Sequence, residues 1–248
     1  TLIVTNNEQL ASINFSNLIS VYKDFLIENK IISKNNSIVI GKGTISGIDT
    51  KRFSQNNTIK CKLKFELNCD ENDFIFMFLG RLNLDKGIMD LVSAFKKINK
   101  VFPNTKLMIV GPDEENIYDK IKTELDISTF IFFGPTNNPE NLIQLCDVFC
   151  LPSHREAFGL SVIEASACEK AVLCSDTYGL KDTIIENVTG LRHITHDVDS
   201  IFDKMQILIQ NNELRISLGK NGRKYVEDNF SKEILTNLWL NYYRSLLK

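Results

Sequence analysis

Continuous apolar runs alternate with amphipathic patterns from about residue 37 onward, and this rhythm constrains the fold more than any other feature. The run "FIFMFL" at 74–79 is apolar on both faces, which is typical of a strand buried inside a parallel sheet. We predict an α/β fold, a Rossmann-like parallel sheet with helices on both faces. The predicted strands are 37–40, 74–79, 106–110, 130–133, 148–151 and 171–175, and the predicted helices are 59–67, 87–102, 115–125, 140–146 and 160–168.

The two ends of the chain follow other patterns. A helical period without a strong strand signal recurs at 198–210, 213–230 and 231–247, which predicts a helical C-terminal tail. Residues 1–36 hold one strand-like "LIV" and one helical stretch, ahead of the regular alternation. We therefore divide the chain into 1–36, a linker or remnant of another unit, a sheet domain at 37–230, and a final helix at 231–248.

Composition narrows the classes of function. Lys and Arg number 29 against 31 Asp and Glu, so the net charge of −2 gives no reason to expect a nucleic-acid groove. The longest apolar run, 74–80, is too short to span a bilayer, and no charged leader with a long apolar core opens the printed sequence. The six cysteines form no C-x-x-C pair, so we expect them to be reduced and mostly buried. These features favour a cytoplasmic protein.

Residues suited to ligand binding follow the predicted strands directly. Ligands of open parallel sheets bind at the carboxyl ends of the strands. Gly80 and Arg81 follow the strand 74–79, with Lys86 close behind, and Gly111-Pro112 follow the strand 106–110. Glycine lets the backbone approach a ligand closely, and the two cations suit a phosphate or diphosphate.

The segment "EAFGLSVIE" adds two carboxylates and a helix start to the same edge. Phe158, Gly159 and Leu160 open the predicted helix 160–168, whose free N–H groups favour an anion. Glu156 and Glu164 are suited to accept hydrogen bonds from hydroxyl groups. An exposed helical Glu usually pairs with a base three or four residues away, and Glu164 has none there. Phosphate and hydroxyl recognition together indicate a nucleotide-sugar, while a plain surface role for both glutamates stays open.

Two weaker motifs point elsewhere. "GKGTISG" at 41–47 has the spacing G-x-G-x-x-x-G and no amphipathic helix after it, which disfavours a dinucleotide site. We expect a flexible loop beside the cleft. His193 and His196 form an H-x-x-H pair without an acidic or cysteine partner nearby, so we expect ordinary surface histidines and no metal site.

The order of these motifs resembles a known family. "GRLNLDKGIMDLVSAF", "LMIVGPD", "FFGPTNNPENLIQLCDVFCLPSHREAFGLSVIEASACEKAVLCSD" and "IIENVTGL" are similar to the carboxyl-terminal half of retaining glycosyltransferases of family 4, which have the GT-B fold. "VIGKGTISGIDTKRF" resembles the entry into that half. The resemblance covers about residues 16–230 and is closest to the branch that builds bacterial capsular and other surface polysaccharides.

The resemblance implies a role for each candidate residue. Arg81 and Lys86 would bind the donor diphosphate and stabilise it as a leaving group, with no catalytic metal and no cofactor. Glu156 would contact the sugar hydroxyls, and Glu164 the ribose. Backbone contacts to phosphate or sugar would come from Phe158, Gly159 and Leu160, and the nucleotide base would lie near Gly111, Pro112, Phe132 and Phe133.

The resemblance also implies a second domain. The family has two Rossmann-like domains, and this sequence shows one, so we expect the acceptor site on a missing amino-terminal half. The fragment alone would then hold a donor, a UDP-sugar rather than a GDP-sugar on resemblance, without turnover. The helix 231–248 would pack on that half, or expose apolar surface and favour a homo-oligomer. A membrane-face acceptor, a glycan or lipid-linked saccharide, is expected for the whole enzyme. A nucleotide-sugar epimerase and a non-enzymatic interaction module remain alternatives.

Overall fold

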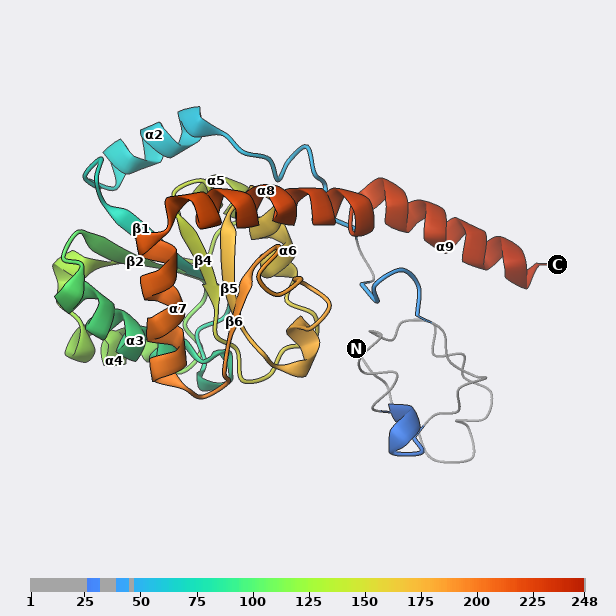
Figure 1. Cartoon of the computed structure of the whole chain (residues 1–248), viewed down its shortest axis with the longest axis horizontal. Helices are drawn as coiled ribbons and strands as arrows, with labels where there is room; N and C mark the ends of the chain where they lie inside the picture. Colours follow the sequence, from blue (N-terminus) through green and yellow to red (C-terminus); the bar gives the residue numbers. More distant parts are fainter. Residues whose placement is uncertain (1–25, 32–38, 45–46, 248) are drawn as a thin grey trace.

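The sheet of the computed structural model is parallel and has the strand order β3-β2-β1-β4-β5-β6 (Figure 1). The structure describes residues 26–31, 39–44 and 47–247. This order is that of the Rossmann fold, with its switch point between β1 and β4. The fold class predicted from the sequence is confirmed. The strands are β1 (Phe74–Leu79), β2 (Thr105–Val110), β3 (Phe130–Gly134), β4 (Val148–Leu151), β5 (Ala171–Ser175) and β6 (Leu191–His193).

The helices form two groups, one on each face of the sheet. α3 packs against α4 and α7, whereas α6 packs against α5 and α8. The chain adds strands from β1 toward one edge of the sheet, at β3, and then returns to the centre and adds β4, β5 and β6 toward the other edge. Because each parallel connection is right-handed, the helices of the two halves lie on opposite faces. The helices are α2 (Asn57–Glu66), α3 (Ile88–Val101), α4 (Ile117–Glu124), α5 (Pro139–Ile143), α6 (Leu160–Ala167), α7 (Val198–Gln210), α8 (Asn212–Asn229) and α9 (Lys232–Leu246).

The central strand β1 explains why the apolar runs are continuous. Ile75, Phe76, Met77 and Phe78 are all fully buried, because helices cover both faces. Phe76 lies edge-on to Phe95 of α3, with ring centroids 6.4 Å apart. Each such side chain contributes about 1.5–3 kcal/mol when it leaves water, so this strand anchors the core.

Short polar side chains begin the helices of the C-terminal tail. The Asp197 carboxylate accepts from Ser200 N ahead of α7, and Asn211 accepts from Leu214 N ahead of α8. The Ser231 hydroxyl does the same for Ile234 N ahead of α9. A cap of this kind contributes about 1 kcal/mol and fixes where each helix begins. The predicted helical tail is confirmed.

The sequence prediction was wrong at two strands. β6 was missed, because Leu191–His193 is only three residues long and its side chains have no apolar repeat. Its pairing with β5 is a long-range contact that local pattern does not show. Val39 and Ile40, predicted to end a strand at 37–40, lie outside any strand, and residues 37 and 38 lie outside the described residues.

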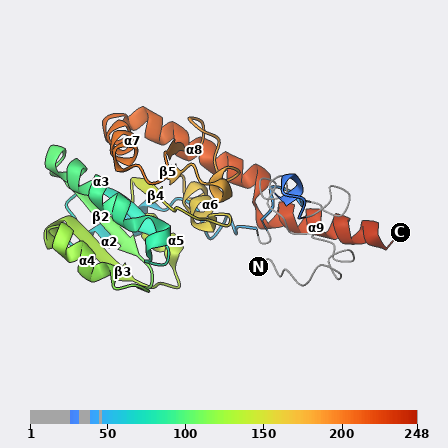
Figure 2. The ribbon, with the colours of Figure 1, turned by 90° about the horizontal axis from the view of Figure 1, so that it is seen from below.

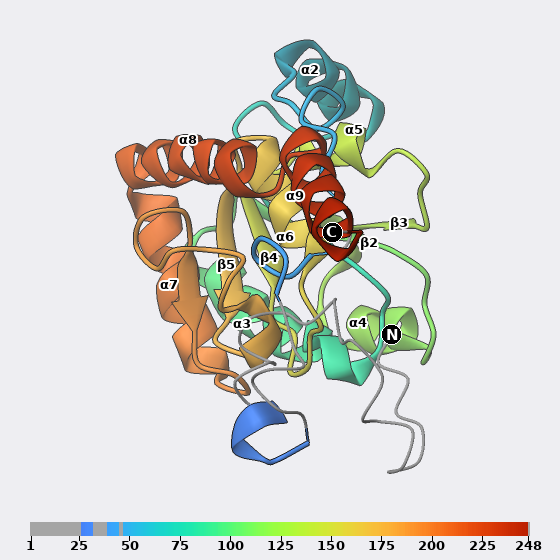
Figure 3. The same cartoon turned by 90° about the vertical axis from the view of Figure 1, so that its right-hand side faces the viewer.

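The helix α9 leaves the sheet domain and points away from it (Figures 1 and 2). Figure 3 views the molecule almost along this helix. An isolated parallel β-bridge between Ile48 and Ser231 holds the start of α9. In it, Ile48 N donates to Phe230 O at 2.8 Å, and Lys232 N donates to Ile48 O at 3.0 Å. The predicted unit 1–36 lies outside the described residues except for 26–31.

None of the described residues of the glycine segment, 41–44 and 47, lines the cleft, which corrects the expected position. Gly41 lies against Leu235 and Leu238 of α9, and Gly47 lies against the backbone of Lys232. A close backbone contact with α9 explains Gly47 without any ligand, because an added Cβ would come within 2.4 Å of the Lys232 Cα.

All six cysteines are free. Cys146, Cys150, Cys168 and Cys174 are buried, as predicted, while Cys69 is half-buried and Cys61 is exposed. Burial raises the pKa of the Cys146 thiol to about 11, which keeps it protonated and unreactive. Across the described residues, no helix is both long and apolar enough to cross a membrane.

Candidate nucleotide-sugar site

A cleft of about 580 Å³ opens at the carboxyl ends of β1 and β4, beside the switch point of the sheet. Seven of the predicted site residues line it, drawn from the loop after β1, the loop after β4 and the start of α6. Its full lining is Leu79, Gly80, Arg81, Lys86, Thr136, Pro139, Leu151, Glu156, Ala157, Phe158, Gly159, Leu160, Ser161 and Glu164.

Lys86 and Glu156 form an ion pair in the cleft. Lys86 Nζ lies 2.7 Å from Glu156 Oε2, and the two side chains are only 16% and 13% exposed. A one-turn helix, η3 (Leu84–Lys86), presents the lysine, with Asn83 accepting from Lys86 N. Gly87 follows at φ 64°, where an added Cβ would lie 2.1 Å from Pro152 O. The loop after β1 and the loop after β4 approach each other closely here, and this brings Lys86 and Glu156 together.

Arg81 lies at the rim and is more exposed. Its side chain is 61% accessible, and Nη1 is 3.2 Å from Glu114 Oε1. Asn83 Nδ2 donates to the same carboxylate at 2.9 Å, and these two partners hold the pKa of Glu114 below its usual value. The guanidinium is therefore held at the entrance rather than inside the cleft.

The start of α6 faces the cleft through its backbone. Gly159 precedes the helix at φ 67°, with no side-chain cap. An added Cβ there would lie 2.3 Å from Leu180 Cδ2, so the position requires glycine. Phe158 is buried and lies edge-on to Phe230, with centroids 5.7 Å apart, whereas Leu160 is exposed. Phe158 thus anchors the turn, and the helix N-terminus offers its N–H groups to an anion.

Glu164 lies one turn into α6, and burial raises the pKa of its carboxyl to about 7. Arg52 partly opposes this shift, but that guanidinium is paired with Glu140 at 2.8 Å. Within the described part of the chain, the influences on this carboxyl are burial and the charges of Arg52 and Glu140, with no hydrogen-bond donor among them. Because buried polar groups are normally hydrogen-bonded, the Glu164 carboxylate is suited to a ligand that donates hydrogen bonds to it.

Four predicted site residues lie outside the cleft. Gly111 has φ 142° and lies so close to β1 that an added Cβ would be 1.8 Å from Gly80 O. Pro112 beside it is exposed. Phe132 stacks on Tyr118 with centroids 4.6 Å apart, and Phe133 is exposed. Their predicted position along the nucleotide base stays a prediction.

Pro139 and Ser161 line the cleft but were not predicted. Pro139 begins α5, and Ser161 is the second residue of α6. Ser161 lies between two residues of the predicted motif, which was the available signal. Pro139 carries no sequence signal for a site, because proline is common in the first turn of any helix.

A second hollow of about 520 Å³ lies at the opposite end of β1. Its lining includes Lys60, Lys64, Phe65, Cys69 and Phe74. Ligands of open α/β sheets bind outside the carboxyl ends of the strands, and this hollow lies at the amino end. The cleft beside α6 is therefore the candidate ligand site.

The histidine prediction was half wrong. His196 is exposed as expected, but His193 ends β6 and is buried, with Nδ1 2.9 Å from Ile194 O. Burial lowers the pKa of His193, which favours the neutral ring. The unrecognised strand is the reason, since it directs His193 into the interior.

Comparison with known proteins decides the family. Residues 60–225 match the family described as Glycosyl transferases group 1. The chain belongs to this family. It is 31% identical, over 235 residues and 91% of its length, to the capsular polysaccharide biosynthesis glycosyltransferase CapM of Staphylococcus aureus. It spans 60% of that relative's length.

Solved structures share the fold. A glycosyltransferase of Rickettsia africae superimposes with a TM-score of 0.85 at 22% identity, over 100% of this chain and 69% of that one. HepE of Anabaena in complex with UDP superimposes with a TM-score of 0.81 at 18% identity, over 93% of this chain and 62% of that one. The predicted relation to glycosyltransferases with a GT-B fold is confirmed, at the level of the group 1 family.

Proposed function

We propose that this chain is the donor-binding half of a retaining glycosyltransferase that transfers a sugar from a nucleotide-sugar. The observation that carries the proposal is the convergence of Lys86, Glu156, the α6 N-terminus and Glu164 on one cleft. A cation and a helix N-terminus suit a diphosphate, and desolvated carboxylates suit hydroxyl groups. A nucleotide-sugar carries both.

Each group has a task in this proposal. Lys86, with Arg81 at the rim, neutralises the diphosphate as it leaves, which places fixed positive charge where negative charge develops. Glu156 accepts from sugar hydroxyls and keeps Lys86 oriented through their ion pair. Glu164 accepts from the ribose. No step in this scheme requires a metal ion.

Two relatives support a proposed donor and a proposed acceptor. HepE binds UDP according to its description, which supports UDP over GDP for this chain. CapM is described as a capsular polysaccharide enzyme, so we infer a glycan or lipid-linked acceptor in bacterial surface polysaccharide synthesis, at the cytoplasmic face of the membrane. The acceptor site belongs to a second, amino-terminal domain in this proposal. The present chain alone then binds donor without turnover.

Calorimetric titration of the chain with UDP and with GDP tests the donor site. We expect UDP to bind in the millimolar range or tighter, and Glu164→Ala to weaken it about tenfold, because hydrogen bonds to a charged acceptor contribute about 1.5–3 kcal/mol. Glu213→Ala, an exposed glutamate in the first turn of α8, is the matched control and leaves binding unchanged. Absence of binding to either nucleotide by a folded chain would refute the proposal.

Two other functions use the same cleft differently. A nucleotide-sugar epimerase would also bind UDP but would convert the donor without an acceptor, so product analysis of a protein carrying both domains separates it from a transferase. A non-enzymatic interaction module would bind no nucleotide in the same titration. The convergence of cation, helix N-terminus and carboxylates favours a nucleotide-sugar enzyme over an interaction module, and the match to the glycosyltransferase family favours a transferase over an epimerase.

A further inference from the structure

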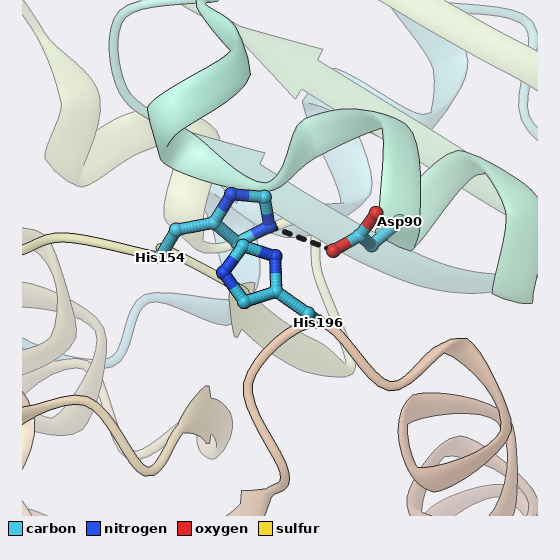
Figure 4. A group of neighbouring side chains, drawn as sticks. All are labelled: Asp90, His154 and His196. Atoms are coloured by element: carbon cyan, nitrogen blue, oxygen red, sulfur yellow. Dashed lines mark hydrogen bonds and ion pairs between the residues drawn. The ribbon is translucent and has the colours of Figure 1, made fainter.

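Three metal-ligating side chains from distant parts of the chain meet outside the cleft (Figure 4). Asp90 lies in the first turn of α3, His154 in the loop after β4, and His196 in the turn between β6 and α7. One ligand atom from each lies within 4.8 Å of the other two. None of the three lines the nucleotide cleft, so the cluster is a separate feature.

The distances within the cluster fit a shared ion. His154 Nε2 lies 2.7 Å from Asp90 Oδ2, and the two imidazole rings have centroids 3.7 Å apart. Ligands of tetrahedral Zn²⁺, at about 2.0–2.1 Å from the metal, are about 3.3 Å from one another. Small side-chain movements therefore bring all three donor atoms to coordinating positions.

The backbone that carries these side chains is held independently of any ion. His154 N donates to Asp85 O at 2.9 Å, and Thr177 Oγ1 donates to His154 O at 3.1 Å. Lys97 of α3 pairs with Asp199 of α7 at 2.5 Å, and the two helices pack together. The cluster is thus preorganised, which lowers the cost of binding.

The turn at His196 presents its imidazole at the surface of the cluster. His196 has φ 63°, in the left-handed region that histidine, asparagine and aspartate adopt more often than other side chains. The His196 side chain is exposed, and those of His154 and Asp90 are 19% and 25% exposed, which leaves a coordination position open to water.

We propose that Asp90, His154 and His196 bind one divalent transition-metal ion of the Zn²⁺ type, with water as a further ligand. Two imidazoles and one carboxylate are a donor set that Zn²⁺ accepts. The ion would join α3, the β4–α6 loop and the β6–α7 turn. His154 lies two residues before Glu156, so the ion would stiffen the loop that carries a cleft carboxylate. The metal site itself does not depend on the proposed donor chemistry.

Imidazole NMR of the untagged chain during Zn²⁺ titration tests this directly. The chain contains only three histidines, and the third, His193, is buried with Nδ1 2.9 Å from Ile194 O, so it serves as the non-ligand reference. We expect the ring signals of His154 and His196 to move together to saturation at one equivalent, and those of His193, which senses the charge of Asp90, to move much less. A structural His154–Asp90 hydrogen bond without a metal would leave all three sets of signals unmoved by Zn²⁺ and would overturn the proposal.

Calorimetric Zn²⁺ titration of variants, under reducing conditions, shows whether the histidines or an exposed cysteine thiol bind the ion. His196→Asn keeps a residue that tolerates the left-handed region, so the fold is retained, and we expect at least tenfold weaker Zn²⁺ binding. Asp90→Asn should weaken binding likewise. Cys61→Ser removes the exposed thiol and should leave binding unchanged. Binding lost in Cys61→Ser but kept in His196→Asn would contradict the proposal.

Discussion

Glu164 carries its carboxylate in surroundings that disfavour the charge. Burial raises the pKa, and Arg52, whose charge opposes this shift, is engaged by Glu140. The sequence indicated that Glu164 has no ion-pair partner on its own helix, because no base stands three or four residues away. It could not predict Arg52 as an electrostatic neighbour, since 112 residues of chain separate the two positions. Only the fold brings such groups together.

Replacing this carboxyl with an amide should stabilise the protein at high pH. The folded pKa is about 7 against an ordinary 4.5, so the folded chain holds the proton more tightly and stability falls as pH rises between these values. We expect Glu164→Gln to increase the free energy of unfolding by roughly 1–3 kcal/mol near pH 8 and to change it little near pH 4.5. Urea denaturation at both pH values measures this, with Glu213→Gln as the control. Equal stabilities of Glu164→Gln and the wild type at both pH values would show that the carboxyl is not desolvated.

The histidines show the same limit of residue-level prediction. Sequence spacing drew attention to His193 and His196, but the structure pairs His154 with Asp90 and places its ring against that of His196, with centroids 3.7 Å apart. Asp90 and His154 are 64 residues apart, so no local spacing could join them. A pattern search finds ligands only when they share one element or one loop.

Strands and helices were predictable where burial imposes a long pattern. β1 and β2 are apolar on both faces, and α7 has the bounds that its period predicted. The three residues of β6 carry no such pattern, because an edge strand this short is defined by its partner β5 rather than by its own residues. Element length therefore decided which predictions succeeded.

Alanine substitution of glycines at the ends of two strands measures how closely their backbones pack against neighbouring atoms. Gly111→Ala places a Cβ 1.8 Å from Gly80 O at φ 142°, so we expect a loss of roughly 3 kcal/mol or more in unfolding free energy. Gly134→Ala is the matched control, because φ is 74° there but no atom lies within 4 Å of the added Cβ. That change should cost only about 1–2 kcal/mol. Thermal denaturation of both variants measures the two losses in stability. Equal losses would contradict the close contact between Gly111 and Gly80, which follow β2 and β1.

At the scale of the whole molecule, one sheet domain carries the cleft and α9 projects from it (Figure 1). Leu240, Tyr243, Leu246 and Leu247 of this end segment are exposed. The chain spans 60% of the length of CapM, and a further domain as the partner of α9 is part of the proposed function. That packing, and the alternative of self-association, stay predictions.

In the proposed function, a nucleoside diphosphate binds at the carboxyl edge of the sheet. Backbone amide NMR during titration with UDP tests it most directly, because every region of the chain reports at once. We predict the largest shifts at Lys86, Gly159, Leu160 and Glu164, with none in the hollow at Lys60 and Phe65. Shifts confined to that opposite hollow, or none at millimolar UDP, would contradict the account.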